Sequence, residues 1–368
     1  MSSKRKELAD TRKAAGLSQE ELARRLGVDR TTVTRWETAE SSPQPWIRPK
    51  LARALGVTPR GLDSLLKDTA PRIEAPGGEG PITEAYVDWL RQHVRQLLLL
   101  DAQFGGNEAS GQAVRLLRSA VRRIGVDSCP QPLWRDLMRA VGELAEVAGW
   151  LLYDADQQDA SRRLSLEALH YLRLAGDREL ELLTLQNLSM QAEYLGRTGE
   201  ALQICDAVLD GTLSGRVRGL FLGRQAHALA KRGQHSEAAR RLSEARATLE
   251  DDGPGWAYWV DERQFAWFEG MLGIERGDFD HAAGVFAEAL ASTPPERVRG
   301  AFSRSVYLLD CLVRAGDVKE AERLVPDVAA RVGEVGSGRT VALLRGVAKR
   351  AELGGGGDLA GLVRESGL

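Results

Sequence analysis

Apolar residues recur at helical spacing in the stretch from Leu17 to Glu37. Steps of three and four residues place side chains on one side of a helix. The stretch therefore predicts two short helices, each of which buries one face in a common core. The residues expected on these inward faces are Leu22, Ala23, Leu26, Val33 and Trp36.

The same stretch carries residues that begin and end helices. Ser18, with Glu21 three positions later, has the sequence of a capping box. Gly27 follows the first apolar segment, where a left-handed C-cap favours glycine. Asp29 is placed to cap the second helix, and its charge suits the positive end of the helix dipole. A tight turn between the two helices is therefore predicted.

The chain on either side of this pair predicts three more short helices. A first helix is expected over residues 4–15, with Leu8 and Ala15 facing inward. A fourth is expected to open at Pro45, because proline suits the first position of a helix. With a fifth helix after it, these elements complete a predicted first domain over residues 1–66.

The composition changes after residue 66. Residues 67–82 are rich in proline and glycine and poor in apolar residues, which is typical of a linker. Residues 83–353 show helical periodicity and no convincing strand. Residues 354–368 begin with four glycines and are expected to form a tail. The predicted fold is all-α: a five-helix domain followed by an α-solenoid.

Segments of the second region are similar to one another. Aligned on a small residue at the start of each second helix, they follow at steps of 41, 37, 44 and 39 residues. Glycine-containing turns precede most of these residues and reverse the chain. We therefore expect about five helix pairs, with extra helices over residues 83–125. The aligned residues are Ala160, Ala201, Ala238, Ala282 and Ala321.

Charge is divided unevenly along the chain. Residues 1–66 carry 13 Lys and Arg against 8 Asp and Glu, a net charge of +5. The remainder carries 37 against 44, a net charge of −7. A basic N-terminal region (the head, residues 1–66) followed by an acidic remainder (the body) indicates contact with nucleic acid through the head alone.

The second helix of the first pair has a polar outward face. Arg can donate two hydrogen bonds to guanine, and Thr can bond a base or a phosphate and touch a thymine methyl. A short, well-capped helix with this face suits the major groove of DNA. An ordinary solvated helix face is the alternative for each residue taken singly. The outward residues are Arg30, Thr31, Thr32, Thr34 and Arg35.

The sequence RKAAGLSQEELARRLGV, a polar helix ending in RWE and then LARALGVTPRGLDSLL resemble the helix-turn-helix domain of Xre-family (phage-repressor-type) regulators. The resemblance covers residues 4–66 and implies that Gln19 contacts DNA. It also implies an ion pair between Arg12 and Glu37 with a structural role. Such domains usually bind paired half-sites as dimers. The positions that read bases in that family are Arg30, Thr31 and Arg35 in this chain.

The second region resembles degenerate tetratricopeptide repeats, although its steps exceed the nominal period of about 34 residues. Peptide-sensing regulators of Gram-positive bacteria combine a similar head and body. The segment LAEVAGWLLYDADQQDASRRLSLEALHYLRLAGD is more similar to the Xre-type tetratricopeptide regulators of actinobacteria. Arginine makes up 42 of the 50 basic residues, which fits a GC-rich genome of that kind.

Such arrays form a superhelix whose first helices line a concave groove, and grooves of this kind bind peptides or partner helices. Counting back from the aligned alanines gives candidate ligand residues on these helices. The candidates are Gln186, Asn187, Met190, Glu193, Tyr194, Arg224, His227, Gln264, Trp267, Met271, Tyr307, Asp310 and Arg314.

Each of these candidates also has a structural interpretation. The amide of Asn187 suits a peptide bond, but it would equally cross-link two helices. Arg224 is placed to meet a ligand carboxylate or to form a salt bridge with a neighbouring helix. Residues 256–268 carry six aromatic residues, which stack on a ligand if they face the groove and otherwise belong to the core.

Nothing in the sequence predicts an enzyme. Residues 333–340, GEVGSGRT, fit a phosphate-loop pattern with Arg339 in place of lysine, but the preceding residues are helix-like where a buried strand is needed. We therefore expect a glycine-rich turn there. The five histidines show no metal-ligand spacing and lie near no nucleophile motif, so no catalytic set, metal or cofactor is expected.

Cysteine usage and hydropathy point to the cytoplasm. Cys129, Cys205 and Cys311 are far apart and are expected to be small buried apolar residues. The N-terminus lacks the apolar core of a signal peptide, and the longest aliphatic run, Leu97 to Leu100, is too short to cross a bilayer. A cytoplasmic, nucleoid-associated protein without membrane contact is expected.

These observations together predict a sequence-specific transcriptional regulator. It would bind a palindromic site in double-stranded DNA as a homodimer, and its repeat region would mediate dimerisation and sense a peptide, a small molecule or a protein. The alternative is a protein-interaction adaptor whose DNA-binding head is non-specific or vestigial.

Overall fold

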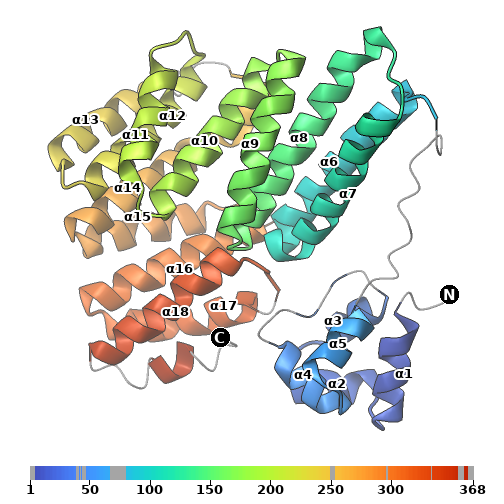
Figure 1. The fold of residues 1–368 in the computed structure, drawn as a ribbon. Coiled ribbons are helices and arrows are strands. Elements are labelled where there is room, and N and C mark those ends of the chain that lie inside the picture. The colour runs from blue at the N-terminus through green and yellow to red at the C-terminus, as the bar shows by residue number, and fades with distance from the viewer. Residues whose placement is uncertain are drawn as a thin grey trace. The chain divides into compact units, whose positions relative to one another are not determined.

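A computed structural model describes residues 5–38, 41, 43, 47–66, 80–248, 253–295, 297–332, 334–354 and 360–363. These residues form helices and turns without a strand, so the predicted all-α fold is confirmed. The chain divides into two compact units between Gly78 and Glu79. The described part of the first unit contains five short helices. The second unit is a stack of antiparallel helices (Figure 1). The finer limits predicted for the linker and the tail stay predictions.

The first unit is held by one small apolar core. Its helices are α1 (Lys6–Ala14), α2 (Gln19–Leu26), α3 (Arg30–Glu37), α4 (Arg48–Leu55) and α5 (Pro59–Leu66). All five residues predicted to face inward from α2 and α3 are buried. The core also includes Leu8, Leu17, Ile47, Leu51, Leu55 and Leu62.

The end of the first helix and the start of the fourth bear on two of the predictions. The first helix ends at Ala14, and Ala15 is exposed rather than inward, because Gly16 follows with a left-handed φ of 72° and turns the chain away from the helix axis. The residue buried beside Leu8 is Ala9 instead. The fourth helix begins at Arg48, and its predicted first residue, Pro45, lies outside the described residues.

The second unit starts with two long helices, α6 (Glu84–Phe104) and α7 (Gly106–Val126). Five antiparallel pairs follow, and α18 (Gly338–Leu353) packs on the last of them. The pairs are α8 (Trp134–Asp154) with α9 (Gln158–Ala175), α10 (Arg178–Tyr194) with α11 (Thr198–Leu209), α12 (Gly215–Lys231) with α13 (His235–Arg246), α14 (Glu262–Arg276) with α15 (Phe279–Ala291), and α16 (Val298–Ala315) with α17 (Val318–Val332). Short 3-10 turns at Gln131–Leu133 and Gly255–Trp259 precede α8 and α14.

Small residues lie where the helices of a pair cross. Four of the aligned alanines are fully buried at the starts of α11, α13, α15 and α17: Ala201, Ala238, Ala282 and Ala321. The first pair differs, because Ala160 is only half-buried and Ser161 takes the crossing position. The Ser161 hydroxyl donates to the carbonyl oxygen of Gly149 at 2.8 Å. A Cβ on Gly149 would lie 2.8 Å from Ser165 Oγ, so this crossing needs glycine.

The second unit closes on itself. The backbone N–H of Gly336, before α18, donates to Phe104 O at 2.7 Å, and its carbonyl oxygen accepts from Asn107 N at 2.8 Å. Gly105 has a φ of 80°, and a Cβ there would lie 2.8 Å from Gly336 O. These bonds join the α6–α7 turn, at the start of the array, to the turn that precedes its last helix.

The phosphate-loop pattern lies at this junction. It connects α17 with α18, so a helix precedes it where a phosphate loop needs a strand. A Cβ on Gly338 would lie 2.6 Å from Ala155 O, which shows how closely the backbone packs on the end of α8. Gly333 lies outside the described residues.

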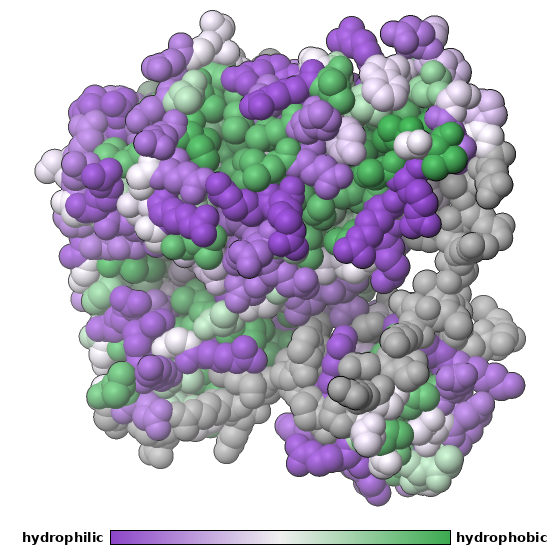
Figure 2. Space-filling view, viewed as in Figure 1, coloured by the Kyte–Doolittle hydropathy of each residue, from purple (hydrophilic) through white to green (hydrophobic). Residues whose placement is uncertain are grey.

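The face of the second unit that Figure 2 presents is both polar and apolar. Figure 2 shows apolar areas between polar side chains on the face presented there. The most exposed large apolar side chains of the described residues come from four different elements: Leu99 from α6, Val126 from α7, Tyr258 from the 3-10 turn before α14, and Leu353 from α18. Cys205 and Cys311 are buried as predicted, but Cys129 is only half-buried because it lies in the turn before α8.

Candidate functional site

The turn between α2 and α3 is built from local hydrogen bonds. Ser18 Oγ accepts from Glu21 N at 3.1 Å, and Ser18 N donates to Glu21 Oε2 at 2.7 Å, which completes a capping box. The backbone and side-chain hydrogen bonds from Ser18 lower the pKa of Glu21. Gly27 ends α2 with a left-handed φ of 70°. The capping box and the left-handed glycine that the sequence predicts are therefore both present.

The start of α3 is capped by Asp29. Its Oδ1 accepts from both the backbone N and the hydroxyl of Thr31, each at 2.7 Å. These two bonds, the hydroxyl first, lower the pKa of Asp29. Because the Thr31 hydroxyl donates to Asp29, its oxygen lone pairs are what it can offer to another molecule.

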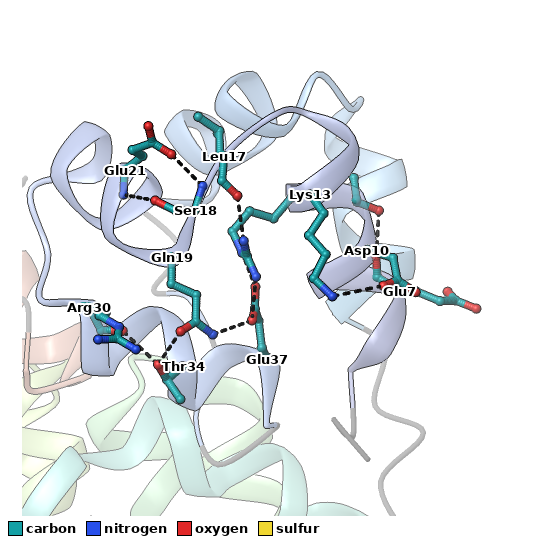
Figure 3. Close-up of polar contacts among 12 residues, drawn as sticks. Glu7, Asp10, Lys13, Leu17, Ser18, Gln19, Glu21, Arg30, Thr34 and Glu37 are labelled. Carbon is teal, nitrogen blue, oxygen red and sulfur yellow. Dashed lines mark hydrogen bonds and ion pairs between the residues drawn. The ribbon is translucent and has the colours of Figure 1, made fainter. Parts of the chain in front are cut away.

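A buried ion pair ties α3 to α1. Arg12 Nε lies 2.5 Å from Glu37 Oε1, and Arg12 Nη2 donates to Glu37 Oε2 at 3.2 Å. Arg12 Nη1 also donates to Leu17 O at 2.6 Å. Both side chains are buried, so the pair is bidentate and shielded from water. Figure 3 shows Glu37, the acceptor of this pair, beside Gln19.

Gln19 extends the network to the surface of α3. Its Nε2 donates to Glu37 Oε2 at 2.7 Å, and its Oε1 accepts from the Thr34 hydroxyl at 3.2 Å (Figure 3). Thr34 also contacts Arg30 O at 3.1 Å. Gln19 therefore has a structural role in this unit, and its contact with DNA stays a prediction.

The outward face of α3 holds the predicted reading residues. Arg30, Thr31 and Arg35 are exposed, whereas Thr32 and Thr34 are half-buried rather than fully outward. No other described residue hydrogen-bonds or ion-pairs with the Arg30 side chain. This arrangement presents guanidinium groups and a hydroxyl on a helix whose orientation is fixed from behind.

Residues 8–62 match the family model described as Helix-turn-helix. They form an Xre-like helix-turn-helix domain. No curated protein matches the chain. The match places α2, α3 and α4 in the helix-turn-helix domain, together with most of α1 and the first half of α5.

The candidate ligand residues of the second unit all lie on the first helices of the pairs. Asn187 on α10 donates through Nδ2 to Glu146 Oε1 on α8 at 2.6 Å, so it cross-links two helices. The neighbouring Gln186 donates to Asn187 Oδ1 and accepts from Arg224 Nε at 3.3 Å. These bonds form a chain of polar contacts from α8 through α10 to α12.

The buried Glu146 is expected to make the stability of the second unit depend on pH. Burial, and then the charge of Glu143, raises the pKa of Glu146 from its ordinary value of 4.5 to about 8. Because Glu146 has a higher pKa in the folded state than in the unfolded state, its contribution to the free energy of unfolding is complete below pH 4.5. That contribution is lost as the pH rises to about 8. Glu146→Gln keeps an acceptor for Asn187, so we expect its stability to decline less between pH 5 and pH 8 than that of the unmodified chain.

Unfolding midpoints at the two pH values measure this effect. Exposed Glu322, replaced by Gln, is the matched control and should follow the unmodified chain. An equal decline in all three proteins would mean that Glu146 is already ionised in the folded state.

Three of the remaining groove candidates, His227, Trp267 and Tyr194, contact side chains from elsewhere in the second unit. His227 contacts Glu193 and lies 3.8 Å from Glu275, and burial lowers the pKa of this histidine. Trp267 packs edge-on against both His227 and Tyr307, with centroids 5.4 and 6.2 Å apart. Tyr194 is exposed and donates to Asp156 at 3.1 Å.

Other candidates have structural positions. Asp310 pairs with Arg314 at 3.0 Å and also with Arg350, Met271 is buried, and Gln264 lies in the first turn of α14. Within residues 256–268, Phe265 and Phe268 are fully buried in the core of the second unit.

Two residues near these candidates escaped the sequence analysis as ligand residues. Tyr153 lies in the last turn of α8, and Arg339 lies in the first turn of α18 with its guanidinium 5.2 Å from the centroid of the Tyr153 ring. Their contact depends on closure of the array, which has no signature in the repeat spacing.

The described ranges hold no group of three or more His, Cys, Asp or Glu arranged to bind a metal ion. None of their helices combines the length and apolarity that a membrane-spanning segment needs.

Proposed function

We propose that this chain is a sequence-specific, DNA-binding transcriptional regulator. The observation that carries the proposal is the exposed face of α3, with Arg30, Thr31 and Arg35, in an Xre-like helix-turn-helix domain. The Arg12–Glu37 pair holds this helix from behind, so its side chains meet DNA in a fixed orientation. The mechanism is insertion of α3 into the major groove, with arginine donating to guanine.

The proposal extends to the second unit. Two copies would associate through it, so that two heads contact half-sites of a palindromic operator. A ligand among the first helices of the pairs would change the spacing of the heads and hence operator affinity. The buried polar chain from Glu146 to Arg224 supports this role, because it ends at Arg224 Nη1, a buried donor that has no acceptor among the described residues. The function needs no cofactor, and we place it in the cytoplasm at the nucleoid.

Arg30→Ala and Arg35→Ala test the reading face. Each is expected to cost about 1–3 kcal/mol of discrimination between the operator and random DNA, because a guanidinium that reads a base is lost. Genome-wide mapping of bound sites identifies the operator, and binding at one fixed salt concentration then measures the preference.

Arg24→Ala is the matched control, since Arg24 is an exposed arginine of the same domain outside α3. A loss of affinity shared equally with Arg24→Ala would reflect charge alone. Equal affinity of the unmodified chain for operator and random DNA would favour the adaptor with a vestigial head.

A further inference from the structure

Arg224 on α12 is a buried cation without a carboxylate partner. Its residue is 4% exposed, and its Nη1 has no hydrogen-bond acceptor. No Asp or Glu of the described ranges lies within ion-pair distance of its guanidinium. Its contacts are Gln186 Oε1, the Met190 sulfur at 3.1 Å, and the rings of Trp267 and Phe268, 5.5 and 5.3 Å away. The salt bridge to a neighbouring helix, one of the two roles considered for Arg224, is absent.

A second arginine adds to the positive charge. Arg339 has a side chain that is 12% exposed, and its Nε lacks an acceptor. Its Nη2 lies 3.6 Å from Asp154 Oδ1, which already accepts from the Ser337 hydroxyl. Burial, and also the charge of Arg339, lowers the pKa of Arg224 to about 10, so Arg224 remains protonated at neutral pH.

The tyrosines of this region do not compensate the charge. Burial is the main cause that raises the pKa values of Tyr153 and Tyr194 to about 12, so both are neutral at pH 7. Asp154 is the carboxylate near Arg339, and it is shared with two other donors, Ser337 Oγ and Gly106 N. Arg224 therefore keeps an unbalanced charge inside the helical stack.

An unpaired buried charge is strongly unfavourable, and cation–π contacts with two rings return only part of the lost hydration. A thioether is a weak acceptor, and methionine has three rotatable side-chain bonds. Met190 is half-buried, and its sulfur occupies the acceptor position of Arg224 Nη2. A small movement of this flexible side chain exposes Nη2.

We propose that Arg224 binds the carboxylate of a ligand with an apolar or aromatic body, which displaces Met190. The site rests on the proposed ligand-sensing function and names its chemistry. A guanidinium matches a planar carboxylate with two parallel hydrogen bonds. Half-buried Trp267 and Tyr307 and exposed Tyr194 supply aromatic surface for the ligand's body. Arg339 strengthens binding through its charge.

The test uses the full chain and two pairs of probes, each an acid with its neutral amide. They are 3-phenylpropionate with 3-phenylpropionamide, for a free organic acid, and N-acetyl-leucyl-phenylalanine with its C-terminal amide, for a peptide end. At ten times its dissociation constant, at least one acid is expected to raise the thermal midpoint by about 3 °C more than its amide. Whichever acid gives the larger shift identifies the source of the carboxylate.

Arg224→Met should abolish the difference between acid and amide, and Arg339→Met should reduce it. Exposed Arg240, which pairs with Glu237 and Glu244, is replaced by Met as the matched control and should retain the difference. Met190→Ala leaves Arg224 in place and should preserve or increase the shift.

A ligand-free measurement makes the test independent of the probes. Without any probe, Arg224→Met is expected to raise the midpoint of the chain, because it removes a buried charge that lacks an anion. A lowered midpoint, no difference between acid and amide in the unmodified chain, or the same difference in Arg224→Met would each overturn the site. A larger Arg224-dependent shift with inorganic phosphate than with either acid would overturn the carboxylate assignment.

The readout does not involve DNA, so it separates this site from the proposed function. An acid that binds through Arg224 but leaves operator affinity unchanged would contradict ligand sensing and leave the site standing. Loss of operator preference in Arg30→Ala has no bearing on the midpoint shift.

Discussion

Replacing Glu37 with alanine is expected to destabilise the helix-turn-helix domain by about 3–5 kcal/mol. The substitution leaves the Arg12 guanidinium buried, with its bond to Leu17 O but without the carboxylate, and it removes the acceptor of Gln19 Nε2. A buried charge that has lost its partner costs far more than an exposed ion pair contributes. Native-state hydrogen exchange of amides in α1 to α3 measures the loss separately from the second unit.

Glu20→Ala is the matched control, because Glu20 is an exposed glutamate of the same domain. We expect it to change the opening free energy by less than about 0.5 kcal/mol. If Glu37→Ala were as mild as this control, the ion pair would not be what holds α3, and the fixed orientation of the reading face would lose its physical basis.

The helices of the first domain were predictable because their signals are local. Ser18 and Glu21 bond each other across three residues, and Gly27 takes the left-handed conformation that its position after an apolar segment requires. Ala15 was misplaced because helical spacing alone does not show where a helix ends. Here Gly16 turns the chain one residue earlier than the apolar pattern indicates.

The pairing in the second unit was also predictable, since a small residue must lie where two antiparallel helices cross closely. The prediction was one position off in the first pair, because Ser161 satisfies its hydroxyl on Gly149 O and thereby takes the place that suits alanine elsewhere. Side-chain partners across pairs were not predictable. Whether Arg224 meets a carboxylate depends on which residues of α8, α10 and α14 face it, and repeat spacing does not determine that.

The closure of the array was not foreseen, because its bonds join residues far apart in the chain. Asp154 and Ser337 are 183 positions apart, yet Ser337 Oγ donates to Asp154 Oδ1 at 2.8 Å. The glycines around Ser337 fit a phosphate-loop pattern and were predicted to form a glycine-rich turn. Their close packing on the α6–α7 turn and on Ala155 explains the need for small residues there without a nucleotide.

Asp154→Ala is expected to destabilise the second unit by about 3–5 kcal/mol and to loosen its closure. Asp154 is fully buried, and its carboxylate accepts from Ser337 Oγ and from Gly106 N at 3.0 Å. Alanine leaves both donors without this acceptor and removes the carboxylate that lies 3.6 Å from Arg339 Nη2. Hydrogen exchange should therefore accelerate most at the starts of α7 and α18, which these bonds join to the end of α8, and less in α11 to α13.

Asp159→Ala is the control, because Asp159 is an exposed aspartate at the start of α9 and none of its side-chain bonds joins the two ends of the array. Its exchange pattern should match that of the unmodified chain to within about 0.5 kcal/mol. A uniform increase across the second unit in Asp154→Ala would mean that the carboxylate stabilises the whole stack rather than its closure. In that case the array would behave as one cooperative body, and a ligand near Arg339 would have no separate junction to act upon.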